Sequence, residues 1–156
     1  MVYYKKELPF SAQTVFEIHT LLGEKLLPKE QLGVVRNKIV EIGASTYTPL
    51  DNQHQLREEF DQFLKKLNAI HDPFEQSLFC LVFLSYFQLF MDGNKRVSRM
   101  IANLVLLKYN LPLISFLAVE RKTFITAILA VYELNDVSLL SQIFVDNYLL
   151  NIERYE

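Results

Sequence analysis

Apolar residues recur at helical spacing in two segments of the first half of the chain, residues 11–22 and 55–68. Each segment would therefore form a helix that buries one face. Ser11 is a residue type that caps the start of helices, and Gly23 is a typical stop signal. The pattern predicts an amphipathic helix in each segment.

Residues 74–91 are apolar on nearly every face; their sequence is FEQSLFCLVFLSYFQLFM. Such a pattern is expected of a helix that other helices surround. Asp72 followed by Pro73 is a start signal, since Asp caps helices and Pro suits the first helical position. This segment should form the central helix of the core.

Gly93 interrupts the apolar pattern, and the helical spacing then resumes over residues 95–109. Pro112 follows shortly after and cannot continue a helix. Two more helices are expected near 118–133 and 137–150. The second half of the chain is thus predicted to be helical throughout.

Residues 34–49 follow a different pattern. Their sequence, VVRNKIVEIGASTYTP, is rich in Val, Ile, Thr and Tyr around a Gly-Ala-Ser turn signal. These residue types are enriched in strands, so the segment predicts a short β-hairpin. The expected fold class is all-α (mainly α), a helical bundle with one small β-hairpin.

The composition indicates one globular domain over residues 1–156, with 51% hydrophobic and 22% charged residues. Sixteen basic and eighteen acidic side chains give a net charge of -2, which provides no broad surface for nucleic acid. The single cysteine, Cys80, excludes an internal disulfide framework. The start lacks a secretory signal, and the apolar stretch 78–91 falls short of the roughly 20 residues that span a bilayer. We therefore expect a cytoplasmic protein with no membrane partner.

The segment FQLFMDGNKRVSRM, residues 87–100, holds the candidate chemistry. Gly93, Asn94 and Lys95 should lie at the start of the helix over 95–109, where unpaired amides and the helix dipole favour an anion. Gly93 allows close approach of a ligand, and Asn94 offers a side-chain amide. The turn is predicted to bind phosphate.

Arg96 and Arg99 are three residues apart, and Asn103 lies on the same helix face. The two guanidinium groups could hold successive phosphates of one nucleotide. Asp92 could bind a Mg²⁺ ion that bridges them, and Lys95 would add a cation or face solvent. An ordinary turn between two helices, followed by a solvated basic face, explains the same spacing, and spacing alone does not decide between the two.

This segment resembles the signature of the Fic family, also called Fido for Fic and Doc, which reads H-x-F-x-D/E-G-N-G/K-R-x-x-R. Gln88 stands where the family has histidine. The segment 34–49 also resembles the flap of the family, and the resemblance covers roughly residues 10–135. The residues at the remaining places of the signature are Phe90, Asp92, Gly93, Asn94, Lys95, Arg96 and Arg99.

The resemblance implies transfer of AMP from ATP to a hydroxyl of a target protein. Asp92 would then bind Mg²⁺, and the amides of Gly93 and Asn94 would form an anion hole. Arg96 and Arg99 would hold the phosphates. The flap would clamp an extended segment of the target; its docking residues would be Val40, Ile42 and Tyr47.

Lys95 is similar to the Doc branch of the family, which uses the nucleotide as a phosphate donor. The resemblance therefore leaves open whether AMP or phosphate is transferred. The inhibitory pattern of the family, S/T-x-x-x-E-G/N, does not occur at Ser11, Thr14 or Ser141. A separate regulatory partner could supply that role.

The glutamine at position 88 changes the expected chemistry. Histidine is the family's general base, whereas the amide of Gln88 has no useful basicity near neutral pH. Loss of a general base costs about 10²- to 10⁴-fold in rate. His19, His54 and His71 have no feature that would bring them to the site as replacements. Two hypotheses follow: a weakened or altered transferase, and a non-catalytic nucleotide-binding module with a regulatory role.

Overall fold

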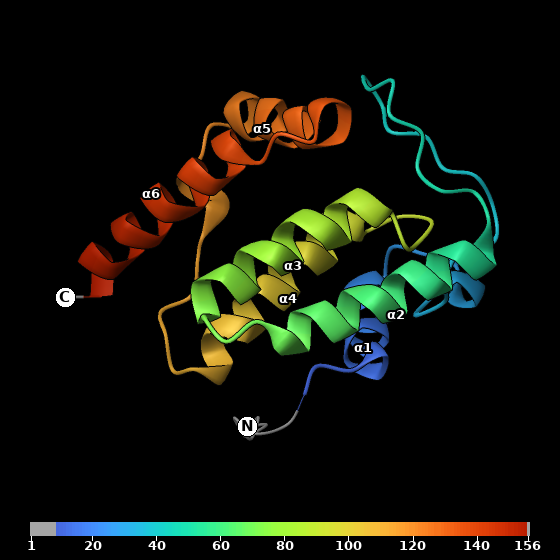
Figure 1. Cartoon of the computed structure of the whole chain (residues 1–156), viewed down its shortest axis with the longest axis horizontal. Coiled ribbons are helices and arrows are strands. Elements are labelled where there is room, and N and C mark those ends of the chain that lie inside the picture. Colours follow the sequence, from blue (N-terminus) through green and yellow to red (C-terminus); the bar gives the residue numbers. More distant parts are fainter. Residues whose placement is uncertain (1–8, 156) are drawn as a thin grey trace.

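The computed structural model describes residues 9–155. Figure 1 shows α3 and α4 at the centre, with α1 and α2 on one side and α5 and α6 on the other. No helix among the described residues has the length and apolarity needed to cross a bilayer. The helices are α1 (Ala12–Gly23), α2 (Gln53–Ala69), α3 (Pro73–Phe87), α4 (Asn94–Lys108), α5 (Arg121–Leu134) and α6 (Ser138–Tyr155), with short 3₁₀ turns at η1 (Lys29–Gln31) and η2 (Phe116–Ala118).

The helix α3 is the centre of the core, as its apolar pattern predicted. Cys80 and Leu81 are fully buried, and Leu84 is 2% exposed. Phe63 of α2 stacks on Phe79 of α3 with ring centroids 5.3 Å apart, so aromatic contacts join these two helices. The fold class predicted from the sequence is confirmed for the helices.

Local capping signals determine where two helices begin. The side chain of Ser11 accepts a hydrogen bond from the amide of Thr14, as an N-cap should. Asp72 accepts from the amides of Phe74 and Glu75, both at 2.9 Å. Both starts lie where the sequence predicted them.

The end of α3 differs from the prediction. The apolar run suggested a helix through residue 91, but α3 ends at Phe87 because Gln88 adopts a left-handed conformation with φ 49°. Leu89 and Phe90 then enter the core from a loop, each 1% exposed. An apolar run therefore marked burial here and not helical structure.

The predicted β-hairpin is wrong, because the described residues 34–50 contain no strand. A turn does occur where it was expected, with the amide of Ser45 donating to the carbonyl of Ile42 at 3.1 Å. The two limbs beside it exchange no backbone hydrogen bonds in the described structure. We call residues 38–50 the flap; it extends as a loop from the bundle towards α5 (Figure 1).

Candidate nucleotide-binding site

The loop between α3 and α4 forms the site. Two left-handed residues, Gln88 and Gly93 (φ 83°), reverse the chain so that α4 begins at Asn94. The side chain of Asn94 is 5% exposed; it accepts from the amide of Phe90 at 2.9 Å and donates to the carbonyl of Phe90 at 2.8 Å. This amide therefore holds the loop together, and Asn94 also lines the pocket described below.

The first turn of α4 presents backbone amides, as predicted for a phosphate site. The amides of Arg96 and Val97 both donate to the carbonyl of Gly93. Those of Asn94 and Lys95 have no acceptor in the described part of the chain. They carry the positive end of the helix dipole, so an anion would be stabilised there.

Asp92 lies next to these amides. Its Oδ1 accepts from the amide of Gly93 at 2.6 Å, and its Oδ2 lies 3.6 Å from Nη2 of Arg96. The Asp92 side chain is 68% exposed and that of Arg96 35%, so this ion pair is weak and its members can exchange partners.

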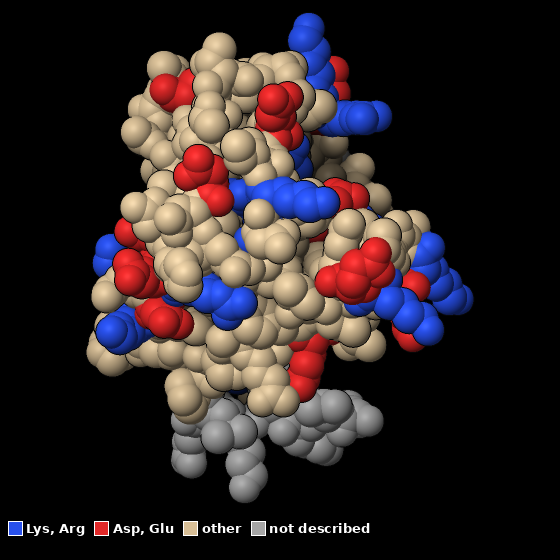
Figure 2. Space-filling model, turned by 90° about the vertical axis from the view of Figure 1, so that its right-hand side faces the viewer, with Lys and Arg blue, Asp and Glu red and all other residues tan. Residues whose placement is uncertain are grey.

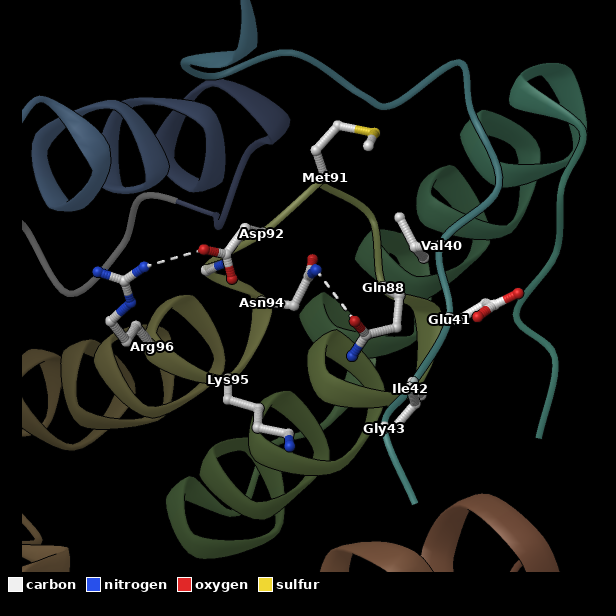
Figure 3. Close-up of a pocket in the computed structure, with 11 residues that line it drawn as sticks. Val40, Glu41, Ile42, Gly43, Gln88, Met91, Asp92, Asn94, Lys95 and Arg96 are labelled. Atoms are coloured by element: carbon white, nitrogen blue, oxygen red, sulfur yellow. Dashed lines mark hydrogen bonds and ion pairs between the residues drawn. The ribbon is translucent and has the colours of Figure 1, made fainter. Parts of the chain in front are cut away.

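The pocket at the start of α4 has a volume of about 260 Å³. Figure 3 shows Gln88 between Asn94 and the flap, with Arg96 and Lys95 pointing to different sides of the turn. Met91 also lines the pocket and was not indicated by the sequence, whereas Glu41 and Gly43 belong to the segment 34–49 that the sequence singled out as a flap. The lining residues are Val40, Glu41, Ile42, Gly43, Gln88, Met91, Asp92, Gly93, Asn94, Lys95 and Arg96.

Arg99 does not line this pocket. It lies with Arg96 in a neighbouring pocket of about 290 Å³, so Arg96 is shared between the two. Arg99 Nε donates to the carbonyl of Lys95 at 3.2 Å. Asn103, on the same face, is bonded to the backbone of Ile114 in both directions and thus fixes the loop after α4.

The flap residues divide into two groups. Val40 and Ile42 line the pocket, whereas Tyr47 stacks on Tyr86 at 4.5 Å and on Tyr132 at 5.6 Å. The hydroxyl of Tyr47 donates to the carbonyl of Tyr86, and burial raises its pKa. Tyr47 therefore anchors the flap to the bundle in this structure.

Gln88 is bonded through both ends of its side-chain amide. Its Oε1 accepts from Asn94 Nδ2 at 3.2 Å, and its Nε2 donates to the carbonyl of Ser85 at 2.6 Å and to the hydroxyl of Tyr132 at 3.5 Å. The glutamine thus joins the end of α3 to the start of α4. The amide offers no proton acceptor of useful basicity.

His19 is buried, as expected for core packing, but its contact with the loop was missed. Its ring stacks on Phe90 at 3.8 Å, Nδ1 accepts from the amide of Gly33 at 2.9 Å, and Nε2 lies 3.0 Å from the carbonyl oxygen of Asp92. Burial lowers its pKa, and the positive charge of Arg96 acts in the same direction. Because Nδ1 accepts from Gly33 and Nε2 faces a carbonyl oxygen, the bonded ring is neutral with its proton on Nε2. His54 and His71 are exposed and do not line the pocket.

Charges on the face seen in Figure 2 are mixed. Lys and Arg side chains lie among Asp and Glu side chains and do not form one continuous patch on this side.

The family model described as Fic/DOC family matches residues 9–106. The chain therefore belongs to the Fic/DOC family, and the resemblance found in the sequence is confirmed. No curated protein sequence matches the chain significantly.

Solved Fic structures share the fold. BepC, a VirB-translocated effector of Bartonella tribocorum with bound AMPPNP, superposes with a TM-score of 0.75 at 17% identity, over 91% of this chain and 78% of that chain. The N-terminal Fic domain of a Bartonella quintana protein with bound ADP gives 0.74 at 17% identity, covering 94% and 79%. Fic-1 from C. elegans gives 0.77 at 22% identity; the match covers 94% of this chain and 43% of that one.

Proposed function

We propose that the chain is a nucleotide-binding Fic protein, related to protein adenylyltransferases, whose transfer of AMP from ATP to a target hydroxyl is weakened or lost. The observation that carries the proposal is the hydrogen bonding of the Gln88 side chain. It occupies the place of the family's base with its amide bonded to Asn94 and Ser85, while the turn beside it keeps its free amides and cations.

Several groups support phosphate binding at the start of α4. The backbone amides of Asn94 and Lys95 lie at the N-terminus of α4, which borders the pocket, and Arg96 lines the same pocket. The Arg96 guanidinium could exchange Asp92 for a phosphate, because breaking an exposed ion pair costs little free energy. Arg99, in the adjoining pocket, would contact a more distant phosphate. BepC and the Bartonella quintana domain bind AMPPNP and ADP, respectively.

Asp92 is the proposed Mg²⁺ ligand. Mg²⁺ in nucleotide sites takes one or two carboxylates and completes its shell with phosphate oxygens and water. The described residues contain no cluster of three or more potential metal ligands, but one exposed carboxylate beside a phosphate site meets this need. Asp92 would hold the ion, whose charge would offset that of the phosphates.

The target hydroxyl must lose a proton during transfer, and neither Gln88 nor the neighbouring His19 and Tyr132 is suited to accept it. Gln88 cannot, and both ring nitrogens of His19 are already bonded. Tyr132 is buried, which raises its pKa and keeps it protonated. We therefore expect a rate about 10²- to 10⁴-fold below that of a Fic enzyme with its histidine.

The target would dock along the flap at Val40 and Ile42. The flap limbs exchange no backbone bonds with each other in the described structure, so an extended peptide could pair with them. Tyr47 would hold the flap while the target binds. ATP and Mg²⁺ are abundant in the cytoplasm, the location that the sequence predicts.

A phosphotransferase of the Doc type is the second candidate. Lys95 favours it, since this exposed lysine lines the pocket and points to a different side from Arg96 (Figure 3). A non-catalytic regulatory module is the third, favoured by the bonded state of Gln88. Calorimetric titration with ATP, with and without Mg²⁺, tests the feature that all three share. Saturable binding at one site that strengthens with Mg²⁺ is expected, and no detectable binding would overturn the proposal.

A further inference from the structure

Arg36 is a charged residue that the proposed chemistry does not use, yet it is only 2% exposed. Among the described residues, the one ion pair joins Arg96 and Asp92, so no carboxylate contacts Arg36 directly, although the charge of Asp51 acts on it from further away. A buried cation is stable only if its donors are satisfied. The contacts of its guanidinium group therefore explain why it is there.

The guanidinium donates to three backbone carbonyls. Nε donates to the carbonyl of Gln88, Nη1 to that of Lys38 at 2.9 Å, and Nη2 to that of Leu50. The backbone amide of Arg36 also donates to the carbonyl of Leu89, at 3.1 Å. One residue thus binds the chain at three separate places.

Two of these places are the ends of the flap. Lys38 begins the flap and Leu50 ends it, and no strand pairing holds the two limbs together in the described structure. The third place, Gln88, begins the loop that carries the phosphate site, and its carbonyl belongs to a left-handed residue just after α3. Arg36 thereby closes the base of the flap and joins that base to the loop.

The tip of the flap is held differently. Oε1 of Glu133 accepts from the hydroxyl of Ser45 at 3.0 Å and from the amide of Thr46 at 3.2 Å, and both contacts are exposed. Exposed contacts of this kind contribute little and exchange readily. The flap therefore has a buried attachment at its base, a releasable one at its tip, and the Tyr47 contacts with Tyr86 and Tyr132 between them.

We propose that Arg36 is a positioning residue that sets where the flap lies relative to the phosphate site. Each of its three guanidinium nitrogens reaches a different carbonyl, whereas the three donors of a lysine ammonium start from a single nitrogen and cannot span the same separation. The assignment goes beyond nucleotide chemistry and holds in the ligand-free protein. A failure to bind ATP would therefore leave it intact.

NMR of the ligand-free chain tests the assignment through Arg36→Lys, with Arg57→Lys on the exposed face of α2 as the matched control. Backbone order parameters for residues 38–50 should fall from a rigid level of about 0.8 towards about 0.6 in Arg36→Lys. Those of α3 and α4 should stay unchanged, as should the whole profile of Arg57→Lys. A folded Arg36→Lys protein with an unchanged flap would overturn the assignment.

The wild-type guanidinium signals provide a test that needs no variant. Three bonded carbonyls should slow rotation of the Arg36 Nη groups, so that separate Nη signals are resolved, unlike those of Arg57. If Arg36→Lys does not fold, this measurement on the wild type alone tests the assignment of Arg36. Slow rotation supports the assignment, and rotation as fast as that of Arg57 refutes it.

Discussion

The ring of His19 donates a hydrogen bond from Nε2 to the backbone carbonyl of Asp92, 73 residues further along the chain, over 3.0 Å. The same ring accepts from the amide of Gly33 and stacks on Phe90. One buried imidazole thus connects α1, the segment before the flap and the loop that carries the proposed metal ligand. The arrangement requires a neutral ring, because Nδ1 must be unprotonated to accept the hydrogen bond from the amide of Gly33.

This requirement predicts a pH dependence. Burial holds the pKa of His19 below 6.5 in the folded chain, so the unfolded chain takes up the proton first as the pH falls. The stability that neutral His19 contributes is complete above about pH 6.5 and is lost below it, towards the lower pKa of the folded state. Melting midpoints between about pH 7 and pH 5 should therefore fall more steeply for the wild type than for His19→Gln. His54 and His71 are present in both proteins, and parallel curves would contradict the prediction.

Gly93 should resist substitution for a reason of backbone conformation. Its φ of 83° disfavours any side chain, although a Cβ would meet nothing closer than 3.6 Å. We expect Gly93→Ala to lower the free energy of unfolding by about 1–2 kcal/mol, measured by urea denaturation. Gly43→Ala is the control, because nothing lies within 4 Å of a Cβ there and its φ is ordinary. Equal effects at the two sites would show that strain at Gly93 does not matter.

Leu84→Ala should destabilise the chain by about 2–5 kcal/mol, because it opens a cavity in the centre of α3. Phe83, next to it, is only partly buried, so Phe83→Ala should cost less. Leu21→Ala, at a position 69% exposed, should change stability by less than about 0.5 kcal/mol. Thermal unfolding of the three variants gives the order, and a neutral Leu84→Ala would exclude α3 as the core.

The helices were predictable because their signals are local. Ser11 and Asp72 cap the helices that follow them through bonds to amides two or three residues away, and such spacing is visible in the sequence. The turn at Gly93 and the start of α4 were predictable for the same reason. The apolar pattern also located the buried central helix.

The features that the sequence did not predict depend mainly on contacts between segments that are distant in the sequence. The flap has strand-forming residues, but side-chain contacts of Arg36, Glu133 and Tyr47 hold it, and its limbs form no ladder in the described structure. The contact of His19 with Asp92 has no local signal. The end of α3 was mispredicted because Gln88 adopts a left-handed conformation within an apolar run.

Arg96 is expected to contribute to nucleotide affinity through its position in the pocket. Replacing it by alanine removes a charge-assisted contact to phosphate and should weaken ATP binding about tenfold or more, as measured by calorimetry. Arg57→Ala removes an exposed arginine of α2 and should bind like the wild type. If Arg96→Ala and Arg57→Ala bind ATP equally well, Arg96 is not a phosphate ligand.

Gln88→His should restore the missing proton acceptor. Histidine tolerates left-handed conformations better than most residues, so the loop should keep its shape. The proposed defect in the wild type would then be chemical and not structural, and the variant should melt close to the wild-type midpoint. A collapse of stability would instead show that the bonds of Gln88 to Ser85 and Asn94 are needed for folding.

The most direct test measures incorporation of labelled AMP and of labelled phosphate in parallel, with the wild type and Gln88→His as enzymes and the chain itself as acceptor. Lys95 leaves both transfers open, so both labels are needed. We predict little or no transfer by the wild type and an increase of roughly 10²-fold or more in Gln88→His. Robust transfer by the wild type that Gln88→His does not improve would show that another residue acts as the base, and would contradict the proposal of a weakened Fic protein.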